Sequence, residues 1–251
     1  MRRGECSFFF YRVTVVRVCS CADFGTWVLW TNTKERLMSL HVVDHPLIAH
    51  KMGVLRRKKL PTKDFNDLVA EITALLLYEA TRDLPTEACR ITCWSGRTTV
   101  RRIKGRMLTF VPILRAGMGM LEGAKRLVPG AKISVVGLWR DHETLDPHEY
   151  YVKLASDMSD RLAIILDPML ATGGSALATF DLLERSGCRD IRGIFLVAAP
   201  EGIARLQAAH PGMKIFVAAV DKRLTGKGDP YPPGYILPGL GDAGDRLFGT
   251  K

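Results

Sequence analysis

An amphipathic stretch between residues 64 and 82 is the clearest local pattern in the chain. Its apolar positions recur at intervals of three and four residues, which places them on one face of a helix. These positions are Phe65, Leu68, Val69, Ile72, Leu75, Leu76 and Ala80. We expect Thr62 to cap this helix at its N-terminus. Pro85 interrupts the pattern, and short strands are expected after it.

Farther along the chain, apolar runs typical of strands alternate with glycine loops and helical segments. The runs are residues 109–114, 132–139, 162–167, 190–199 and 214–221. The run 162–167 is almost purely apolar, so we expect it to be buried on both faces of a sheet. Strands that alternate with helices predict an α/β fold with a parallel sheet. Ligands of such sheets bind beyond the carboxyl ends of the strands.

The first 37 residues do not follow this organisation. They are rich in aromatic and β-branched residues and contain a Cys-Ser-Cys sequence. Arg12 and Arg17 interrupt the apolar stretch and no clear cleavage site follows, so a signal peptide is not indicated. We interpret residues 1–37 as a non-native or disordered extension upstream of a start at Met38. The alternative is an additional strand packed on the domain.

Charge and composition narrow the possible partners. The 251 residues carry 36 Lys and Arg against 26 Asp and Glu, a formal net charge of +10. This charge favours polyanionic partners, such as nucleotides, phosphorylated metabolites or nucleic acid, without choosing among them.

The chain contains no run of about 18 uncharged apolar residues, so the sequence predicts no membrane-spanning helix. Six irregularly spaced cysteines indicate neither a zinc site nor a disulfide framework, so we expect reduced thiols in a cytoplasmic protein.

The sharpest chemical signal is the segment DPMLATGGS, residues 167–175. It leaves a predicted buried strand through Asp167 and ends in Thr-Gly-Gly-Ser, where a helix begins. Backbone N–H groups and the helix dipole at such a terminus favour a phosphate, and Thr172 and Ser175 add hydroxyl donors. The carboxylate of Asp167 suits sugar hydroxyls or a metal ion instead. The segment therefore favours a phosphorylated sugar.

A second segment, PILRAGMG at residues 112–119, places Arg115 between a strand and a glycine-containing helix start. An arginine in this position is a good anion ligand. The glycines also leave open a dinucleotide site, because Gly117, Gly119 and Gly123 resemble a fingerprint of that kind. Arg140 could then hold a 2′-phosphate. Such a site would not explain the segment 167–175.

Two further polar segments complete the set. Residues 138–144, with Arg140, follow a predicted strand and indicate an exposed hairpin or a lid that closes over an anion. Residues 235–245 combine three glycines with Asp242 and Asp245, which is a suitable frame for a small planar ligand held by backbone groups.

Together these segments resemble uracil phosphoribosyltransferase, a family with the type I phosphoribosyltransferase fold. The resemblance rests on HPLIAHKMG, LLLYEAT, VPILRAGMGM, ILDPMLATGGSA, LVAAPEGI and PGLGDAGDRLFGT. It implies a twisted parallel sheet flanked by helices and a small C-terminal hood over the base. The domain would span residues 38–251, and the hood roughly residues 222–251 with part of the N-terminal lead-in. The connection 222–234 is longer than is usual in the family.

The resemblance also implies roles for particular residues. Arg115 and Arg140 would hold the diphosphate of 5-phosphoribosyl 1-diphosphate (PRPP), Asp167 its ribose, and Ala171 to Ser175 its 5′-phosphate. The full set implied for PRPP is Arg115, Arg140, Asp167, Pro168, Met169, Leu170, Ala171, Thr172, Gly173, Gly174, Ser175 and Asp242. Uracil would be bound by Ile236, Gly241, Asp242 and Ala243. Arg115, Arg140 and Asp242 would be the catalytic residues.

The implied activity is the transfer of the phosphoribosyl group from PRPP to uracil, which yields UMP and diphosphate. Mg²⁺ would act through the diphosphate and would need no dedicated protein ligand set. The resemblance further implies a homo-oligomer and a possible GTP effector, and no nucleic-acid or membrane partner. Two alternatives stay open. One is a PRPP-binding regulator that binds RNA through the basic run 56–59, and the other is an NADP-dependent oxidoreductase that uses residues 109–140.

Overall fold

The computed structural model describes residues 39–105, 108–140 and 147–250. The interpretation of residues 1–37 as an extension lies outside these residues. None of the helices within the described ranges is long and apolar enough to cross a membrane.

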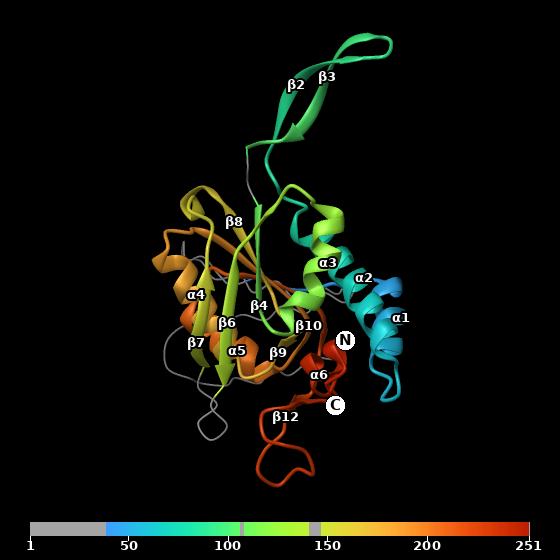
Figure 1. The fold of residues 1–251 in the computed structure, drawn as a ribbon, viewed down its shortest axis with the longest axis vertical. Helices are drawn as coiled ribbons and strands as arrows, with labels where there is room; N and C mark the ends of the chain where they lie inside the picture. The colour runs from blue at the N-terminus through green and yellow to red at the C-terminus, as the bar shows by residue number, and fades with distance from the viewer. Residues whose placement is uncertain (1–38, 106–107, 141–146, 251) are drawn as a thin grey trace, which may run out of the picture. The chain divides into compact units, whose positions relative to one another are not determined.

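Helices and strands alternate along most of the described chain (Figure 1). The helices are α1 (Pro46–Leu55), α2 (Thr62–Ala80), α3 (Gly117–Leu127), α4 (Gly174–Arg185), α5 (Pro200–Ala209) and α6 (Ala243–Phe248), with a 3₁₀ turn at Met158–Asp160. The strands are β1 (Ser39–Val42), β2 (Thr86–Cys93), β3 (Gly96–Ile103), β4 (Leu108–Leu114), β5 (Lys132–Ile133), β6 (Val135–Arg140), β7 (Pro147–Lys153), β8 (Leu162–Leu166), β9 (Met169–Leu170), β10 (Asp190–Ala198), β11 (Lys214–Val220), β12 (Arg223–Leu224) and β13 (Ile236–Leu237).

The main sheet runs in the order β1-β11-β10-β8-β4-β6-β7, with β5 paired to β4 and β9 to β10. Every pair in it is parallel except the edge pair β6–β7. Both of its faces are covered: one core packs α1, α2, α3 and α6 against the sheet, and the other packs α4 and α5. The expected parallel α/β sheet is confirmed, and β8 is buried at all five positions.

Two local expectations were wrong. Thr62 is the first residue of α2 and not its cap, because the carbonyl of Pro61 accepts the first helical hydrogen bond, from the amide of Phe65 at 2.9 Å. The expected strand 132–139 is divided at Ser134. This buried serine accepts a hydrogen bond through its hydroxyl from the amide of Ala155, at 3.0 Å. The strands on its two sides, β5 and β6, both pair with β4.

Strands β2 and β3 form the short strands expected after Pro85. They pair with each other in an antiparallel hairpin that stands away from the main sheet (Figure 1). Most of its residues are exposed, and Trp94 at the turn is 99% exposed.

The position of a ligand crevice follows from the topology. Strands β4 and β8 are neighbours, but α3 leaves β4 on one face of the sheet and α4 leaves β8 on the other. The chain therefore diverges at the carboxyl ends of these two strands, which opens a crevice between them. Arg115 follows β4 and Asp167 follows β8, so both residues lie at this crevice.

Candidate active site

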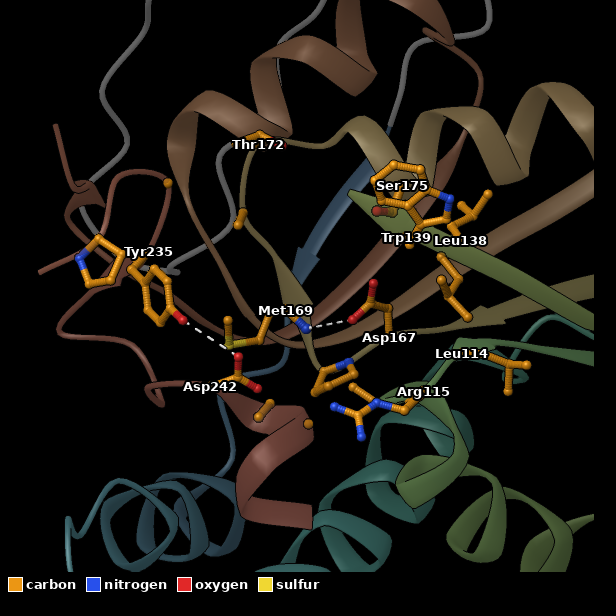
Figure 2. Close-up of a pocket in the computed structure, with 18 of the residues that line it drawn as sticks. Leu114, Arg115, Leu138, Trp139, Asp167, Met169, Thr172, Ser175, Tyr235 and Asp242 are labelled. Carbon is orange, nitrogen blue, oxygen red and sulfur yellow. Dashed lines mark hydrogen bonds between the residues drawn. The ribbon is translucent and has the colours of Figure 1, made fainter. Parts of the chain in front are cut away.

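A cavity of about 880 Å³ occupies the crevice (Figure 2). Four segments line it: the ends of β4 and β6, the loop from β8 into α4, and parts of the hood. The lining residues are Ile113, Leu114, Arg115, Ala116, Leu138, Trp139, Asp167, Pro168, Met169, Ala171, Thr172, Ser175, Lys227, Pro232, Pro233, Gly234, Tyr235, Asp242, Ala243 and Gly244. The structure thus brings all four sequence segments to one cavity.

The loop between β8 and α4 has the geometry of an anion cradle. Gly173 adopts a left-handed conformation, with φ of 79°, and serves as the N-cap of α4. Ser175 lies in the first turn of this helix, where backbone N–H groups have no acceptor within the helix. Asp167, at the other end of the loop, accepts a hydrogen bond from the amide of Met169 through Oδ1, at 3.1 Å. The loop therefore offers donors at its helical end and a carboxylate at its strand end.

Helix α5 fixes the cradle from behind. A Cβ atom at Gly202, in the first turn of α5, would lie 2.2 Å from the carbonyl oxygen of Ala171. A Cβ atom at Gly173 would lie 3.0 Å from the carbonyl oxygen of Gly202. Only glycine permits this approach of two backbones. Gly202 belongs to the sequence motif LVAAPEGI, but the motif alone does not indicate this packing role.

Not every residue assigned to PRPP faces the cavity. Pro168, Met169, Ala171 and Thr172 line it, whereas Gly173 and Gly174 are not among its lining residues. Leu170 is 1% exposed and belongs to the core between the sheet and α4.

Arg115 enters the cavity from the end of β4, through a peptide bond with Leu114 that is cis. Its guanidinium lies 3.9 Å from Oδ1 of Asp245, measured from Nη2, and 5.7 Å from the centre of the Phe248 ring. The side chain is 60% exposed, so it can donate most of its N–H groups to a bound anion.

The glycines of α3 are packing residues, which removes the main support for a dinucleotide site. A Cβ atom at Gly117 would lie 2.3 Å from the carbonyl oxygen of Leu166. A Cβ atom at Gly123 would lie 2.0 Å from the carbonyl oxygen of Ala70. A Cβ atom at Gly119 would lie 2.4 Å from the side chain of Leu247. These glycines let α3 approach β8, α2 and α6, so their spacing reflects helix packing.

The polar segment 138–144 begins as part of a hairpin. Leu138 and Trp139 line the cavity, and Arg140 ends β6 at the same edge of the sheet. Trp139 stacks on the ring of His148 in the antiparallel partner β7, with 4.7 Å between the ring centres. Residues 141–146 lie outside the described part of the chain, so the expected lid and the contacts of Arg140 stay predictions.

Asp242 faces the cavity from the start of α6 (Figure 2). Its Oδ1 accepts a hydrogen bond from the amide of Asp245 at 2.9 Å, which makes it the N-cap of the helix. Its Oδ2 accepts a longer hydrogen bond, of 3.5 Å, from the hydroxyl of Tyr235. The capping bond therefore holds the carboxylate of Asp242 in a defined orientation at the cavity.

The other residues assigned to uracil differ in position. Ala243 lines the cavity beside Asp242, but Ile236 is 3% exposed and packs in the core beneath the hood. Gly241 adopts a left-handed conformation with φ of 72° and is not a lining residue. Any contact of Ile236 or Gly241 with a base would therefore run through the backbone.

The long connection between β12 and β13 is an ordered turn of the hood. Thr225, which is buried, donates its hydroxyl to the carbonyl of Pro232 at 2.6 Å and accepts from the amide of Tyr235 at 2.8 Å. Arg223 pairs with Asp229 at 2.7 Å and thereby lowers the pKa of that carboxyl. The turn brings Lys227 to the cavity, and sequence reasoning missed this cation because its only signal was a lysine between two glycines.

The charged lining of the cavity combines two cations, Arg115 and Lys227, with two carboxylates, Asp167 and Asp242. The cations suit phosphate groups. Mg²⁺ prefers oxygen ligands and keeps several of its waters, so one or two carboxylates together with a diphosphate would fit it. The residues present therefore fit Mg²⁺ bound chiefly through a phosphorylated ligand.

Comparison with known proteins places this geometry in a family. The model of a family described as uracil phosphoribosyltransferase matches residues 42–250. The AQ2163 protein from Aquifex aeolicus is 36% identical, with a TM-score of 0.79 over 84% of this chain and 99% of that chain. The orotate phosphoribosyltransferase of Mycobacterium tuberculosis in complex with PRPP is 12% identical, with a TM-score of 0.44 over 71% of this chain and 91% of that one. Since the family match takes in all four segments of the cavity, the chain belongs to the uracil phosphoribosyltransferase family and has the type I phosphoribosyltransferase fold.

Proposed function

We propose that the protein transfers the phosphoribosyl group of PRPP to uracil and releases UMP and diphosphate. The observation that carries the proposal is that one cavity joins the anion cradle ending at Ser175 to the hood carboxylate of Asp242. A phosphorylated sugar and a planar base could thus lie side by side within it.

In this proposal the donor spans the floor of the cavity. The cradle Ala171 to Ser175 receives the 5′-phosphate, and Asp167 accepts hydrogen bonds from the ribose hydroxyls. Arg115 and Arg140, at the ends of neighbouring strands β4 and β6, bind the diphosphate. Arg115 has an exposed guanidinium for that purpose, and the assignment of Arg140 rests on its position at the end of β6.

The reaction breaks the bond between the anomeric carbon and the diphosphate oxygen and forms a bond from that carbon to N1 of uracil. The diphosphate leaves with the bonding electron pair, and the proton of N1 passes to water. Positive charge develops on the ribose in between, so no nucleophilic side chain is needed. Catalysis then depends on orientation and on stabilisation of the departing diphosphate by Arg115 and Arg140. Mg²⁺ bound through the diphosphate of PRPP would add to that stabilisation.

We assign recognition of the base to the hood. Backbone groups of residues 236–243 would pair with the edge of uracil, and Asp242 would lie where the base meets the anomeric carbon. Cytosine carries an amino group where uracil has a carbonyl, so it would leave a buried group mispaired. We therefore expect strong discrimination against cytosine.

The alternatives have less support. An RNA-binding regulator would use the run 56–59, but Arg56 makes a 2.6 Å ion pair with the buried Asp221, which leaves only Arg57, Lys58 and Lys59 of the run exposed. An NADP-dependent oxidoreductase would use the α3 glycines to bind the dinucleotide, but the close packing of α3 on its neighbours already accounts for these glycines.

The β2–β3 hairpin supports a homo-oligomer as part of the proposal. A two-stranded hairpin is only marginally stable in water by itself, yet this one exposes Ile91, Trp94, Val100 and Ile103. A second copy of the chain would bury such side chains, and light scattering of the full-length protein measures the oligomeric state. Activation by GTP and a cytoplasmic location stay predictions.

The proposal is tested by an assay for UMP with uracil, PRPP and Mg²⁺, followed by chromatography of the products. UMP and diphosphate are expected in equal amounts. In parallel, PRPP with Mg²⁺ should raise the melting temperature, whereas NADPH and a uridine-rich RNA should not. Stabilisation by NADPH or RNA without UMP formation would refute the proposal.

A further inference from the structure

The turn that leads into the base-binding end of the hood is held by side chains from distant parts of the chain. Gly239 has φ of 59°, and a Cβ atom there would lie 2.1 Å from the carbonyl oxygen of Ile236. The turn is therefore tight and accepts only glycine at this position. It directs the chain toward Asp242, three residues later, at the cavity.

Asp221, which directly follows β11 and is 7% exposed, binds this turn. Its Oδ2 accepts a hydrogen bond from the amide of Gly239 at 2.8 Å. Its own amide donates to the carbonyl of Ala198 at the end of β10, also at 2.8 Å. The turn is thus attached to the ends of two neighbouring strands of the main sheet, β10 and β11.

Arg56, at the C-terminal end of α1, completes the attachment. Its two terminal nitrogens donate to the two carboxylate oxygens of Asp221, at 2.9 and 2.6 Å. Nη1 also donates to the carbonyl of Gly239 at 2.9 Å. Both backbone groups of Gly239 are therefore bound by a pair of oppositely charged side chains, and such charge-assisted, bidentate bonds are strong and directional.

A second arginine holds the next residue of the hood. Arg246 donates from Nη1 to the carbonyl of Leu240 at 2.9 Å and from Nη2 to that of Arg57 at 2.7 Å. Its guanidinium lies over the ring of Phe65, 4.2 Å from the ring centre. The segment that precedes Asp242 is thereby fixed on two sides before any ligand binds.

We propose that Arg56 and Asp221 are positioning residues for the base: they hold the Gly239 turn so that the backbone of residues 240–243 is preorganised for it. Neither residue lines the cavity, and the anion cradle belongs to a different loop. Loss of the pair should therefore weaken binding of the base and leave binding of PRPP nearly unchanged. This inference rests on the proposed function for the identity of the base. The expectation that base binding weakens while PRPP binding stays nearly unchanged does not depend on that identity.

The test compares Arg56→Gln, Arg56→Lys and Asp221→Asn with Arg57→Gln as the matched control. Arg57 is the next residue in the chain, and no hydrogen bond or ion pair of its side chain is found among the described residues. For Arg56→Gln we expect the KM for uracil to rise about tenfold and the Kd for PRPP to change less than about twofold. Arg56→Lys should lie between Arg56→Gln and the wild type, because a lysine cannot make the bidentate pair. Parallel increases in both constants, or an effect equal to that of Arg57→Gln, would overturn the proposal.

A second measurement does not depend on turnover. Hydrogen–deuterium exchange of the ligand-free protein should become faster for residues 236–243 in Arg56→Gln and stay unchanged for the cradle 167–175. Unchanged exchange at 236–243 would refute the positioning role even if no base were a substrate. If the wild type used a base other than uracil, the proposed function would fail, and the KM split would be measured with that base.

Discussion

The hydroxyl of Tyr235 lies 3.5 Å from Oδ2 of Asp242 and joins the end of the long hood connection to the N-cap of α6, where we propose that the base binds. Oδ1 of the same carboxylate caps α6. Asp242 thus has a structural and a proposed catalytic role, and the two can be separated by substitution.

Asp242→Asn and Asp167→Asn should affect different steps. Asparagine caps a helix about as well as aspartate, so Asp242→Asn should change the melting temperature little and chiefly lower kcat. Asp167→Asn keeps an acceptor for the amide of Met169 but loses the charge that faces the ribose, so it should chiefly weaken PRPP binding. PRPP affinity, kcat and melting temperature are measured for both variants. Losses confined to melting temperature, and equal in both, would show that the two carboxylates only stabilise turns.

Arg115→Ala should lower kcat/KM by about 10² or more, if the lost contact is worth roughly 3 kcal/mol in the transition state. Arg126→Ala is the control, because Arg126 lies on the adjoining helix α3 and pairs with Glu122 at the surface. Steady-state kinetics of both variants measure kcat/KM. An equal effect of both substitutions, or unchanged turnover in Arg115→Ala, would contradict the anion-binding role.

Gly117→Ala should destabilise the fold by about 1–3 kcal/mol, as overpacking does. The added Cβ would meet the carbonyl oxygen of Leu166 at 2.3 Å and push α3 away from β8. Because Arg115 and Asp167 adjoin these elements, PRPP affinity should fall as well. Gly130→Ala is the control: nothing lies within 4 Å of a Cβ there, so its effect should stay within about 0.5 kcal/mol. Urea unfolding of both variants measures the difference, and equal stabilities would contradict the packing role.

Asp83 predicts a pH-dependent contribution to stability far from the cavity. Burial raises the pKa of this carboxyl, but hydrogen bonds from Lys214 and Arg192 outweigh that effect and lower the pKa to about 2, from 3.8. A lowered carboxyl pKa adds stability above the unfolded pKa, and this stability is lost as the pH falls from about 4 to 2. The side chain of Asp83 is 49% exposed, so screening should limit the contribution to about 1 kcal/mol.

The measurement compares unfolding of the wild type and Asp83→Asn at pH 6 and pH 2. The wild type should be more stable at pH 6, and the difference should vanish near pH 2. Asp67→Asn, which removes an exposed partner of Lys63, should cost less than about 0.5 kcal/mol at pH 6. A difference for Asp83→Asn that persists undiminished at pH 2 would exclude titration as its origin.

The elements of the sheet could be predicted because their signals are local. The apolar run of β8 and the glycine loop after it identify a buried strand and a helix start without any other part of the chain. The division of one strand at Ser134 could not be predicted, because it depends on a hydrogen bond from Ala155, across the hairpin.

In the candidate site, too, sequence reasoning could find residues in local motifs but not contacts between distant residues. Asp167, Arg115 and Asp242 stand in motifs, so sequence reasoning found them. Arg56 and Asp221 are 165 positions apart, and nothing near Asp221 in the sequence indicates its partner. The charge of Arg56 even suggested an exposed nucleic-acid surface. Its role depends on tertiary contact.

The most direct test of the account is a competition assay. The full-length protein is given PRPP and Mg²⁺ with equal concentrations of uracil, cytosine, orotate and hypoxanthine, and the nucleoside monophosphates are identified by mass spectrometry. The account predicts UMP as the main product, with the cytosine product lower by at least about 10². A different nucleotide as the main product, or none, would contradict the assignment of the hood to uracil.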